Sequence, residues 1–251
     1  MYDFDIFFLI RGEIITEDFL ISLKQKNPNA MFIMYQWDSI KNNSNYVHLL
    51  SYFDKVFTFD MVDAQKLNIN YLPLFYTKKY EDLELSNDKK YDLVFFGSYN
   101  ADRLEILKKI NKECLKLDLV FKHHLFIQKL LLLKKIIFFQ IKFKDLKYLS
   151  TEPVSTDEIL ENYKITKAVL DIENLRQNGF TMRTFEVLGA NLKLITTNKR
   201  ILKESIYNKM IIFLLNRESP FLKRSFFEVQ GVSNIKVSEN SISKFVLKII
   251  N

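Results

Sequence analysis

The sequence predicts an α/β fold built from two Rossmann-like domains. Short, almost wholly apolar runs alternate with segments in which apolar residues recur at helical spacing. Such apolar runs are typical of strands that are buried on both faces of a parallel sheet. The alternation is interrupted once, by the charged and turn-rich stretch 77–90, and then starts again. We therefore expect an N-terminal domain over 1–76, a linker over 77–90 and a C-terminal domain over 91–251.

The N-terminal domain is expected to alternate strands and helices as doubly wound proteins do. Its first apolar run ends at Arg11-Gly12, and its later runs end in polar residues that include Asp38 and Asp60. The expected strands cover 5–10, 30–35, 54–60 and 71–74, and the expected helices cover 17–25, 46–52 and 63–67.

The C-terminal domain repeats this pattern from residue 91. One helix start is indicated by a capping box, because Ser155 can accept a backbone hydrogen bond while Glu158 bonds back to it. The expected strands cover 91–98, 117–121, 167–172, 193–198 and 210–215. Helices are expected over 101–115, from 155 through 163, over 181–189, 201–207 and 241–250, with a short one starting at 219.

Composition limits the class of protein. With 251 residues, of which 48% are hydrophobic, the chain can bury a large core. Its single cysteine, Cys114, fits a reducing cytoplasm and excludes an internal disulfide framework. The first residues lack the basic segment of a signal peptide, and no uninterrupted apolar run is long enough to span a membrane. We expect a cytoplasmic protein.

The net charge of +7 is weak evidence for a particular kind of binding partner. Only seven of the 37 basic residues are Arg, while Ile, Asn, Phe and Lys are frequent throughout, so the bias looks genome-wide. Proteins that read bases depend on Arg, and we expect no nucleic-acid partner. Attraction to phosphorylated substrates or to anionic lipid fits this charge better.

The segment 177–198 is the most informative part of the chain. It begins with a polar glycine loop, opens a short helix near Thr181, ends that helix at Gly189 and enters a buried strand. A helix start behind a glycine loop offers free backbone N–H groups and a positive dipole end, which suit a phosphate. Arg183 and Glu186 lie three residues apart and can share one face of the helix. Many α/β proteins pass from loop to helix in the same way, so this pattern alone leaves both interpretations open.

The same segment resembles the donor site of GT-B glycosyltransferases, and more narrowly that of bacterial CgeB-like, lipopolysaccharide-core and capsule glycosyltransferases. The resemblance covers most of the chain, best over 91–110 and 167–215. It implies a nucleotide-sugar donor and a glycan or lipid-linked acceptor, with no separate cofactor. Carried over by position, it implies Glu186 as the ribose ligand, Arg183 beside the phosphates, a diphosphate loop of Gly179, Phe180 and Thr181, and Gln177 at the start of this donor-binding segment.

A second group of donor-binding candidates lies earlier in the chain. Gly97 and Ser98 end an expected strand, and Arg103 stands on the helix that follows. Ligands of open α/β sheets bind at the carboxyl ends of strands, where the winding reverses. The alternative is a tight turn followed by a solvated Arg. His123, which we expect just after a strand, is a further candidate for the donor site.

Catalytic groups are harder to assign. No Asp-x-Asp motif of the metal-dependent transferases appears beyond the extreme terminus, so no metal site is expected. An inverting enzyme would take its base from the N-terminal domain, where Asp38 and Asp60 are the candidates. Each can equally be a helix cap or a turn residue. The resemblance also departs here, because the N-terminal domain looks short by about one βαβ unit.

Residues 126–149 mix large apolar side chains with lysine. One interpretation is a monotopic contact with an anionic membrane, with the lysines reaching toward the lipid headgroups. The other, which the sequence favours, is a buried helix followed by a loop of the C-terminal domain.

We therefore expect a GT-B-like glycosyltransferase of bacterial surface-polysaccharide synthesis that works without a metal. The alternatives are a degenerate nucleotide-sugar-binding protein without turnover and a generic nucleotide-binding α/β protein. A reductase is disfavoured, because no Gly-x-Gly-x-x-Gly follows any expected strand.

Overall fold

The computed structural model describes residues 4–229 and 237–251, which belong to two compact α/β units. Unit 1 comprises Met1–Tyr76, Glu173–Met182 and Ser238–Asn251, and unit 2 comprises Thr77–Ile172 and Arg183–Val237. The division differs from the expected one in two respects. The stretch 77–90 packs as part of unit 2, where it contains the short helix α3 (Lys78–Glu81), and two later segments of the chain return to unit 1.

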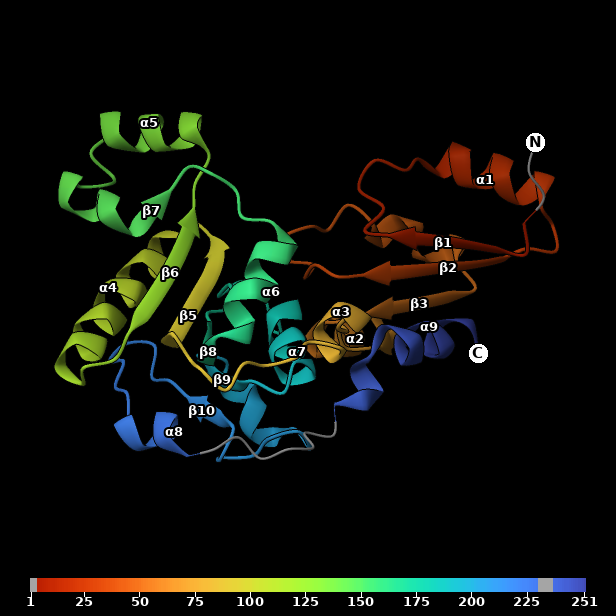
Figure 1. The fold of residues 1–251 in the computed structure, drawn as a ribbon. Coiled ribbons are helices and arrows are strands. Elements are labelled where there is room, and N and C mark those ends of the chain that lie inside the picture. Colours follow the sequence, from red (N-terminus) through yellow and green to blue (C-terminus); the bar gives the residue numbers. More distant parts are fainter. Residues whose placement is uncertain (1–3, 230–236) are drawn as a thin grey trace. The chain divides into compact units, whose positions relative to one another are not determined.

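Unit 1 is built on a parallel sheet of four strands, and Figure 1 shows those that it labels with their arrows pointing the same way. The order is β1-β2-β3-β4, so each strand pairs with the next one in sequence. The strands are β1 (Ile6–Ile10), β2 (Met31–Gln36), β3 (Lys55–Thr58) and β4 (Asn70–Tyr71). They alternate with α1 (Glu17–Lys26), the 3₁₀ helix η1 (Val47–Tyr52) and α2 (Met61–Leu67). These elements match the expected order closely.

The last helix of the chain, α9 (Ile242–Ile250), packs on unit 1 rather than on the C-terminal domain to which its sequence position assigned it. Its apolar face explains this. The ring of Phe245 lies edge-on to that of Tyr35, with centroids 4.9 Å apart, and 4.3 Å from the centroid of Phe75. Backbone hydrogen bonds between Tyr76 and both Asn240 and Ile242 fasten the start of this segment, which includes the 3₁₀ turn η4 (Ser238–Asn240).

Unit 2 holds a six-stranded parallel sheet in the order β10-β9-β8-β5-β6-β7. Its strands are β5 (Tyr91–Ser98), β6 (Phe121–Phe126), β7 (Leu149–Ser150), β8 (Thr166–Asp171), β9 (Lys193–Thr196) and β10 (Ile212–Leu214). The chain runs outward from β5 to β7, returns to β8 beside β5 and then runs outward the other way. The winding therefore reverses between β5 and β8.

Helices cover both faces of this sheet (Figure 1). Phe95 of β5 joins the main core beneath α4 (Ala101–Lys116), whereas the neighbouring Phe96 contacts Tyr163 of α6 (Thr156–Lys164) on the other face. The remaining helical segments are α5 (Lys129–Ile137), η2 (Phe143–Tyr148), α7 (Met182–Gly189), η3 (Lys199–Lys203) and α8 (Arg224–Glu228). The expected α/β class, with two Rossmann-like units of parallel strands, is confirmed.

Some expected element boundaries are wrong. The strand expected over 117–121 is found at 121–126, because Leu117 caps α4 and Asp118 makes a turn with a left-handed φ of 52° before the strand begins. The helix expected over 201–207 is a 3₁₀ helix that ends at Lys203, and the short helix expected from 219 starts at Arg224.

Candidate functional site

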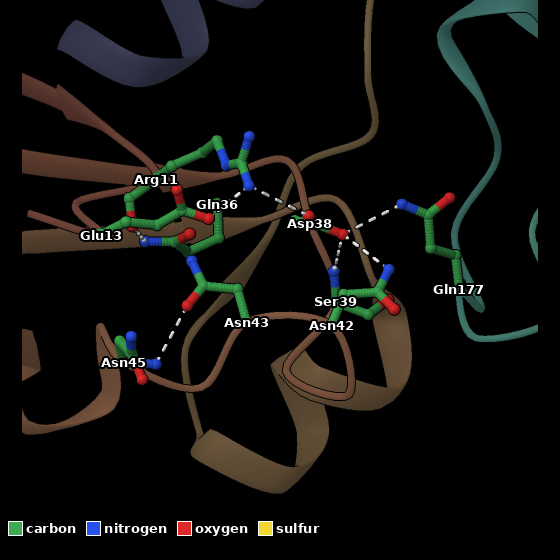
Figure 2. Close-up of polar contacts among 9 residues, drawn as sticks. All are labelled: Arg11, Glu13, Gln36, Asp38, Ser39, Asn42, Asn43, Asn45 and Gln177. Carbon is green, nitrogen blue, oxygen red and sulfur yellow. Dashed lines mark hydrogen bonds and ion pairs between the residues drawn. The ribbon is translucent and has the colours of Figure 1, made fainter. Parts of the chain in front are cut away.

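Asp38 lies at the carboxyl end of the unit 1 sheet, two residues beyond β2, where Figure 2 shows it between polar groups from three loops. Its Oδ1 atom accepts hydrogen bonds from the backbone N–H of Ser39 (3.1 Å), from Asn42 Nδ2 (2.9 Å) and from Gln177 Nε2 (3.1 Å). Its Oδ2 atom is approached by Arg11 Nη2, at 3.5 Å. The side chain is 20% exposed, so the carboxylate is held by these donors and is still partly open to solvent.

Asp60, the second candidate base, is fully buried and engaged in structural contacts. It caps α2, with its Oδ1 accepting from the backbone N–H groups of Val62 (3.0 Å) and Asp63 (3.4 Å). Its Oδ2 accepts from the hydroxyl of Ser39 and from the backbone N–H of Asn178 (3.0 Å). This set of donors makes Asp60 a cross-link between the β2 loop, α2 and the glycine loop.

The glycine loop at 177–181 belongs to unit 1, although it comes about a hundred residues after the unit's strands in the chain. Gln177 reaches Asp38 and Asn178 reaches Asp60, so the structure brings two donor-loop positions to the two candidate bases. Gly179 lies so close to Phe59 that a Cβ would stand 2.7 Å from the backbone oxygen and 2.5 Å from the ring. The glycine is therefore required here for close approach between backbones, and the next residue, Phe180, is buried.

Buried polar atoms without a hydrogen-bond partner gather beside Asp38. Four of the five recorded in the described residues are here: Arg11 Nε, Gln36 Oε1, Asn43 Nδ2 and Tyr46 Oη. Gln36 Nε2 donates to the carbonyl of Arg11 (2.9 Å), which joins the ends of β1 and β2. Burial raises the pKa of Tyr46 far above its ordinary value, with nearby carboxylates adding to the effect. Sequence reasoning did not identify this cluster. The one feature that the sequence offers for these residues is that they follow expected strands.

In unit 2, Arg103 lies at the point where the winding reverses. Its Nε donates to the carbonyl of Ile172, just past β8, at 2.9 Å, and its Nη1 donates to the carbonyl of Ser98, at the end of β5, at 3.0 Å. The guanidinium thus spans the carboxyl ends of the two strands that border the switch point, which is where α/β sheets bind ligands. Gly97 and Ser98 end β5 at this same place.

A second charged group lies at the same edge of the sheet, and sequence reasoning did not find it. Arg217 pairs with Asp102 in the first turn of α4, at 2.8 Å, and its Nη1 donates to Thr197 Oγ1 at 3.3 Å. The contacts connect the segments that follow β9 and β10 with the helix that follows β5. No sequence motif marks Arg217, because its partners are 20 and 115 residues away in the chain.

Arg183 and Glu186 form an ion pair of 3.0 Å within α7, and both are largely enclosed. Tyr163 lies against Arg183, whose Nη1 donates to its hydroxyl at 2.9 Å, while Tyr80 hydrogen-bonds with Glu186. Burial raises the pKa of Glu186, and the charge of Arg183 opposes that rise. The Glu186 side chain is 13% exposed, so the pair is a partly buried charge cluster rather than the open face that its spacing suggested.

His123 lies inside β6 rather than after a strand, which corrects the position expected for it. Its ring stacks on that of Tyr148, with centroids 5.3 Å apart, and its Nδ1 is buried without a partner. Burial lowers the pKa of His123. The structure places it among packed rings, and no described contact joins it to Gly97, Ser98 or Arg103.

Two further properties bear on chemistry. Within the described residues, no three His, Cys, Asp or Glu side chains gather in a way that could hold a metal ion. Among residues 4–229 and 237–251, every helix is too short or too polar to cross a lipid bilayer.

Comparisons with known proteins identify the fold. The chain is similar to a glycosyltransferase from Rickettsia africae, with a TM-score of 0.56 and 12% identity over 98% of this chain and 75% of the other. It is less similar to the lipopolysaccharide outer core galactosyltransferase WaaB, with a TM-score of 0.43 and 12% identity over 76% of this chain. It covers 56% of the WaaB chain. A UDP-GlcNAc 2-epimerase from Methanocaldococcus jannaschii gives a TM-score of 0.47 and 13% identity, over 98% of this chain and 76% of the other.

Neither the comparison with family models nor that with curated proteins gave a match. At 12% identity the Rickettsia structure shows a shared fold with two Rossmann-like units, and its activity does not transfer with it.

Proposed function

We propose that the protein is a GT-B-type glycosyltransferase that moves a sugar from a nucleotide-sugar to a hydroxyl of a lipopolysaccharide, capsule or other glycan acceptor. The observation that carries this proposal is the switch point of unit 2, where Arg103 joins the carboxyl ends of β5 and β8. The shared fold with the Rickettsia glycosyltransferase and the resemblance of the 177–198 segment to a donor site support it.

The donor diphosphate is proposed to bind where β5 passes into α4. Asn100 caps this helix and leaves its first backbone N–H groups at the carboxyl edge of the sheet, beside Gly97 and Ser98. Arg103 and Arg217 supply positive charge at the same edge. Charge of this sign stabilises a departing nucleoside diphosphate without a metal.

Glu186 is proposed as the ribose ligand, with Arg183 as its neighbour at the phosphates. A carboxylate has about four acceptor positions, and Arg183 and Tyr80 use part of them. The remaining positions can accept hydrogen bonds from ribose hydroxyls.

Asp38 is the better candidate for the base that activates the acceptor. In an inverting reaction the base takes the proton of the acceptor hydroxyl, the hydroxyl oxygen bonds to C1 of the donor sugar, and the bond from C1 to the diphosphate breaks. The Asp38 side chain is 20% exposed and is held by Asn42 and Gln177, whereas Asp60 is buried and caps α2. We therefore assign Asp60 a positioning role for the loops around Asp38.

The first test is ligand binding measured as thermal stabilisation by UDP-, GDP-, CMP- and dTDP-sugars. A donor at about 100 times its dissociation constant should add about 2.7 kcal/mol of stability. The shift should be lost in Glu186→Gln, which keeps the shape of the side chain, and retained in Glu161→Gln, a control on the exposed face of α6. Absence of a shift with every donor, from a folded sample, would refute the donor site.

The second candidate function is donor binding without transfer, and turnover separates the two. Release of nucleoside diphosphate should be measured with the donor that stabilises the protein, with and without a crude glycan acceptor. Release that depends on the acceptor and on Asp38 supports the transferase. Binding without any release supports the non-catalytic alternative.

A further inference from the structure

Residues 129–147 of unit 2 present a large apolar surface to solvent, which we call the α5–η2 surface. Helix α5 has no buried residue, so the expectation of a buried helix in this part of the chain is wrong. Six large apolar side chains are each at least 57% exposed: Leu130, Leu133, Ile137, Phe138, Phe139 and Phe143. Scattered apolar residues on a surface need no explanation, but six within one short segment do.

The surface is anchored at its base, so the exposure is not that of a detached loop. Ile141 and Tyr148 are buried, and Asp145 forms an ion pair with Lys108 of α4 at 3.2 Å. Just before the first of these anchors, Phe139 is 93% exposed and takes a left-handed φ of 53°. Figure 1 shows α5 beyond the carboxyl end of β6, at the edge of unit 2.

Charge identifies the kind of partner. The segment 129–147 contains six lysines and one acidic residue, Asp145, which gives 6 − 1 = +5. Five of the lysines are exposed: Lys129, Lys134, Lys142, Lys144 and Lys147. Asp145 is turned inward to Lys108, and within the part of the chain that the structure describes only Lys129 of these lysines has an acidic partner near the surface, Glu152 at 2.9 Å. The exposed face is therefore apolar and basic at once.

We propose that the α5–η2 surface docks on an anionic lipid bilayer. Apolar side chains interleaved with lysine are typical of monotopic contacts, in which the rings enter the interface and the lysines meet anionic headgroups. With nine residues, α5 is too short to span a membrane, so the contact lies in the plane of the interface. A second copy of this chain would set one strongly basic surface against another, so lipid is the occupant that the charge favours.

This inference goes beyond the proposed function and does not depend on it, because lipid binding requires no sugar donor. The test is cosedimentation of the full chain with vesicles of phosphatidylcholine alone and of equal parts phosphatidylcholine and phosphatidylglycerol. Three variants are compared with the wild type. They are Phe138→Ser/Phe139→Ser/Phe143→Ser, the charge reversal Lys142→Glu/Lys144→Glu, and the matched control Lys112→Glu/Lys209→Glu with two exposed lysines elsewhere in unit 2.

Binding to the anionic vesicles should exceed binding to the neutral ones and should weaken with salt. The triple Phe variant and the Lys142/Lys144 variant should each bind about tenfold more weakly or worse, while the control stays within about twofold of wild type. Their folding is checked by melting temperature, which exposed positions should leave unchanged.

The proposal is overturned if the wild type does not bind anionic vesicles at low salt, or if the triple Phe variant binds them as well as the wild type does. A wild-type dimer that the triple variant converts to a monomer, without vesicle binding, would instead assign the surface to a second copy.

Discussion

Replacing Asp60 by Ala should destabilise unit 1, although Asp60 and Asp38 look alike in sequence. Asp60 is fully buried and accepts from the N–H groups of Val62 and Asp63, from Ser39 and from Asn178. Loss of a helix N-cap costs about 1 kcal/mol. The other buried donors lose a charged acceptor, at a cost of about 1–3 kcal/mol. We expect Asp60→Ala to lower the free energy of unfolding by about 2–4 kcal/mol.

The only tryptophan makes the measurement specific to this unit. Trp37 follows β2 in unit 1 and is 38% exposed, so its fluorescence during urea unfolding reports on unit 1 alone. The matched variant is Asp38→Ala, whose side chain is 20% exposed and whose side-chain donor Asn42 is itself exposed to water. It should cost about 1 kcal/mol or less. Equal costs for the two variants, or a cost below about 1 kcal/mol for Asp60→Ala, would refute the assignment of Asp60 as a buried cross-link.

Three further predictions follow from the same contacts. Gly179→Ala should lower the stability of unit 1 by about 1–3 kcal/mol, because a Cβ would stand 2.7 Å from the backbone oxygen of Phe59. The control Leu175→Ala, at a 65% exposed position of the same segment, should leave the stability unchanged in the same urea titration. His123→Phe should stabilise unit 2 in acid. Burial lowers the pKa of His123 in the folded state, so protonation in acid destabilises the wild type. Melting curves at about pH 5 and about pH 8 should therefore show a larger gain for the variant at the lower pH. Asp38→Asn should abolish acceptor-dependent release of nucleoside diphosphate while leaving donor-induced thermal stabilisation intact.

The sequence predicted correctly those helices and strands that are determined by interactions between residues close together in the chain. The apolar run 91–98 and the helix after it appear as expected, because the strand is buried on both faces and Asn100 caps the helix. The start of α6 follows from Ser155, whose side chain accepts from the N–H of Glu158. In each case the determining contacts lie within a few residues of one another.

The expectations that were wrong concern features that depend on contacts between segments far apart in the sequence. The return of α9 to unit 1 depends on Tyr35 and Phe75, more than 160 residues earlier than Phe245. The strand expected at 117–121 was wrong because apolar residues around Asp118 belong to a helix end and a turn. For the candidate site, the sequence placed Asp38 and Asp60 correctly at strand ends. It could not show which of them is the better candidate base, because the two differ in how deeply the side chain is buried.

Gly179 shows how one residue can satisfy two interpretations. The sequence assigned it to a diphosphate loop, and the structure gives a packing reason, its approach to Phe59, that would require glycine with or without a ligand. The glycine therefore contributes nothing to the case for donor binding. That case depends on the switch point at Arg103 and on whether Glu186 binds a ligand.

Whether Glu186 binds the donor can be tested separately from its role in folding, because Glu186 forms a buried pair with Arg183. Replacing Glu186 by Ala alone leaves Arg183 enclosed without its charge partner, which should cost about 3–5 kcal/mol, so a loss of donor binding in that variant could reflect unfolding. The double variant Arg183→Met/Glu186→Met replaces the pair by apolar side chains of similar volume, and such exchanges are often neutral or stabilising. Thermal melting should show that the double variant recovers most of the stability lost in the single one. If Glu186 is a donor ligand, nucleotide-sugar stabilisation stays absent in this well-folded double variant. Stabilisation that returns with the fold would show that the pair is structural and that the donor does not contact Glu186.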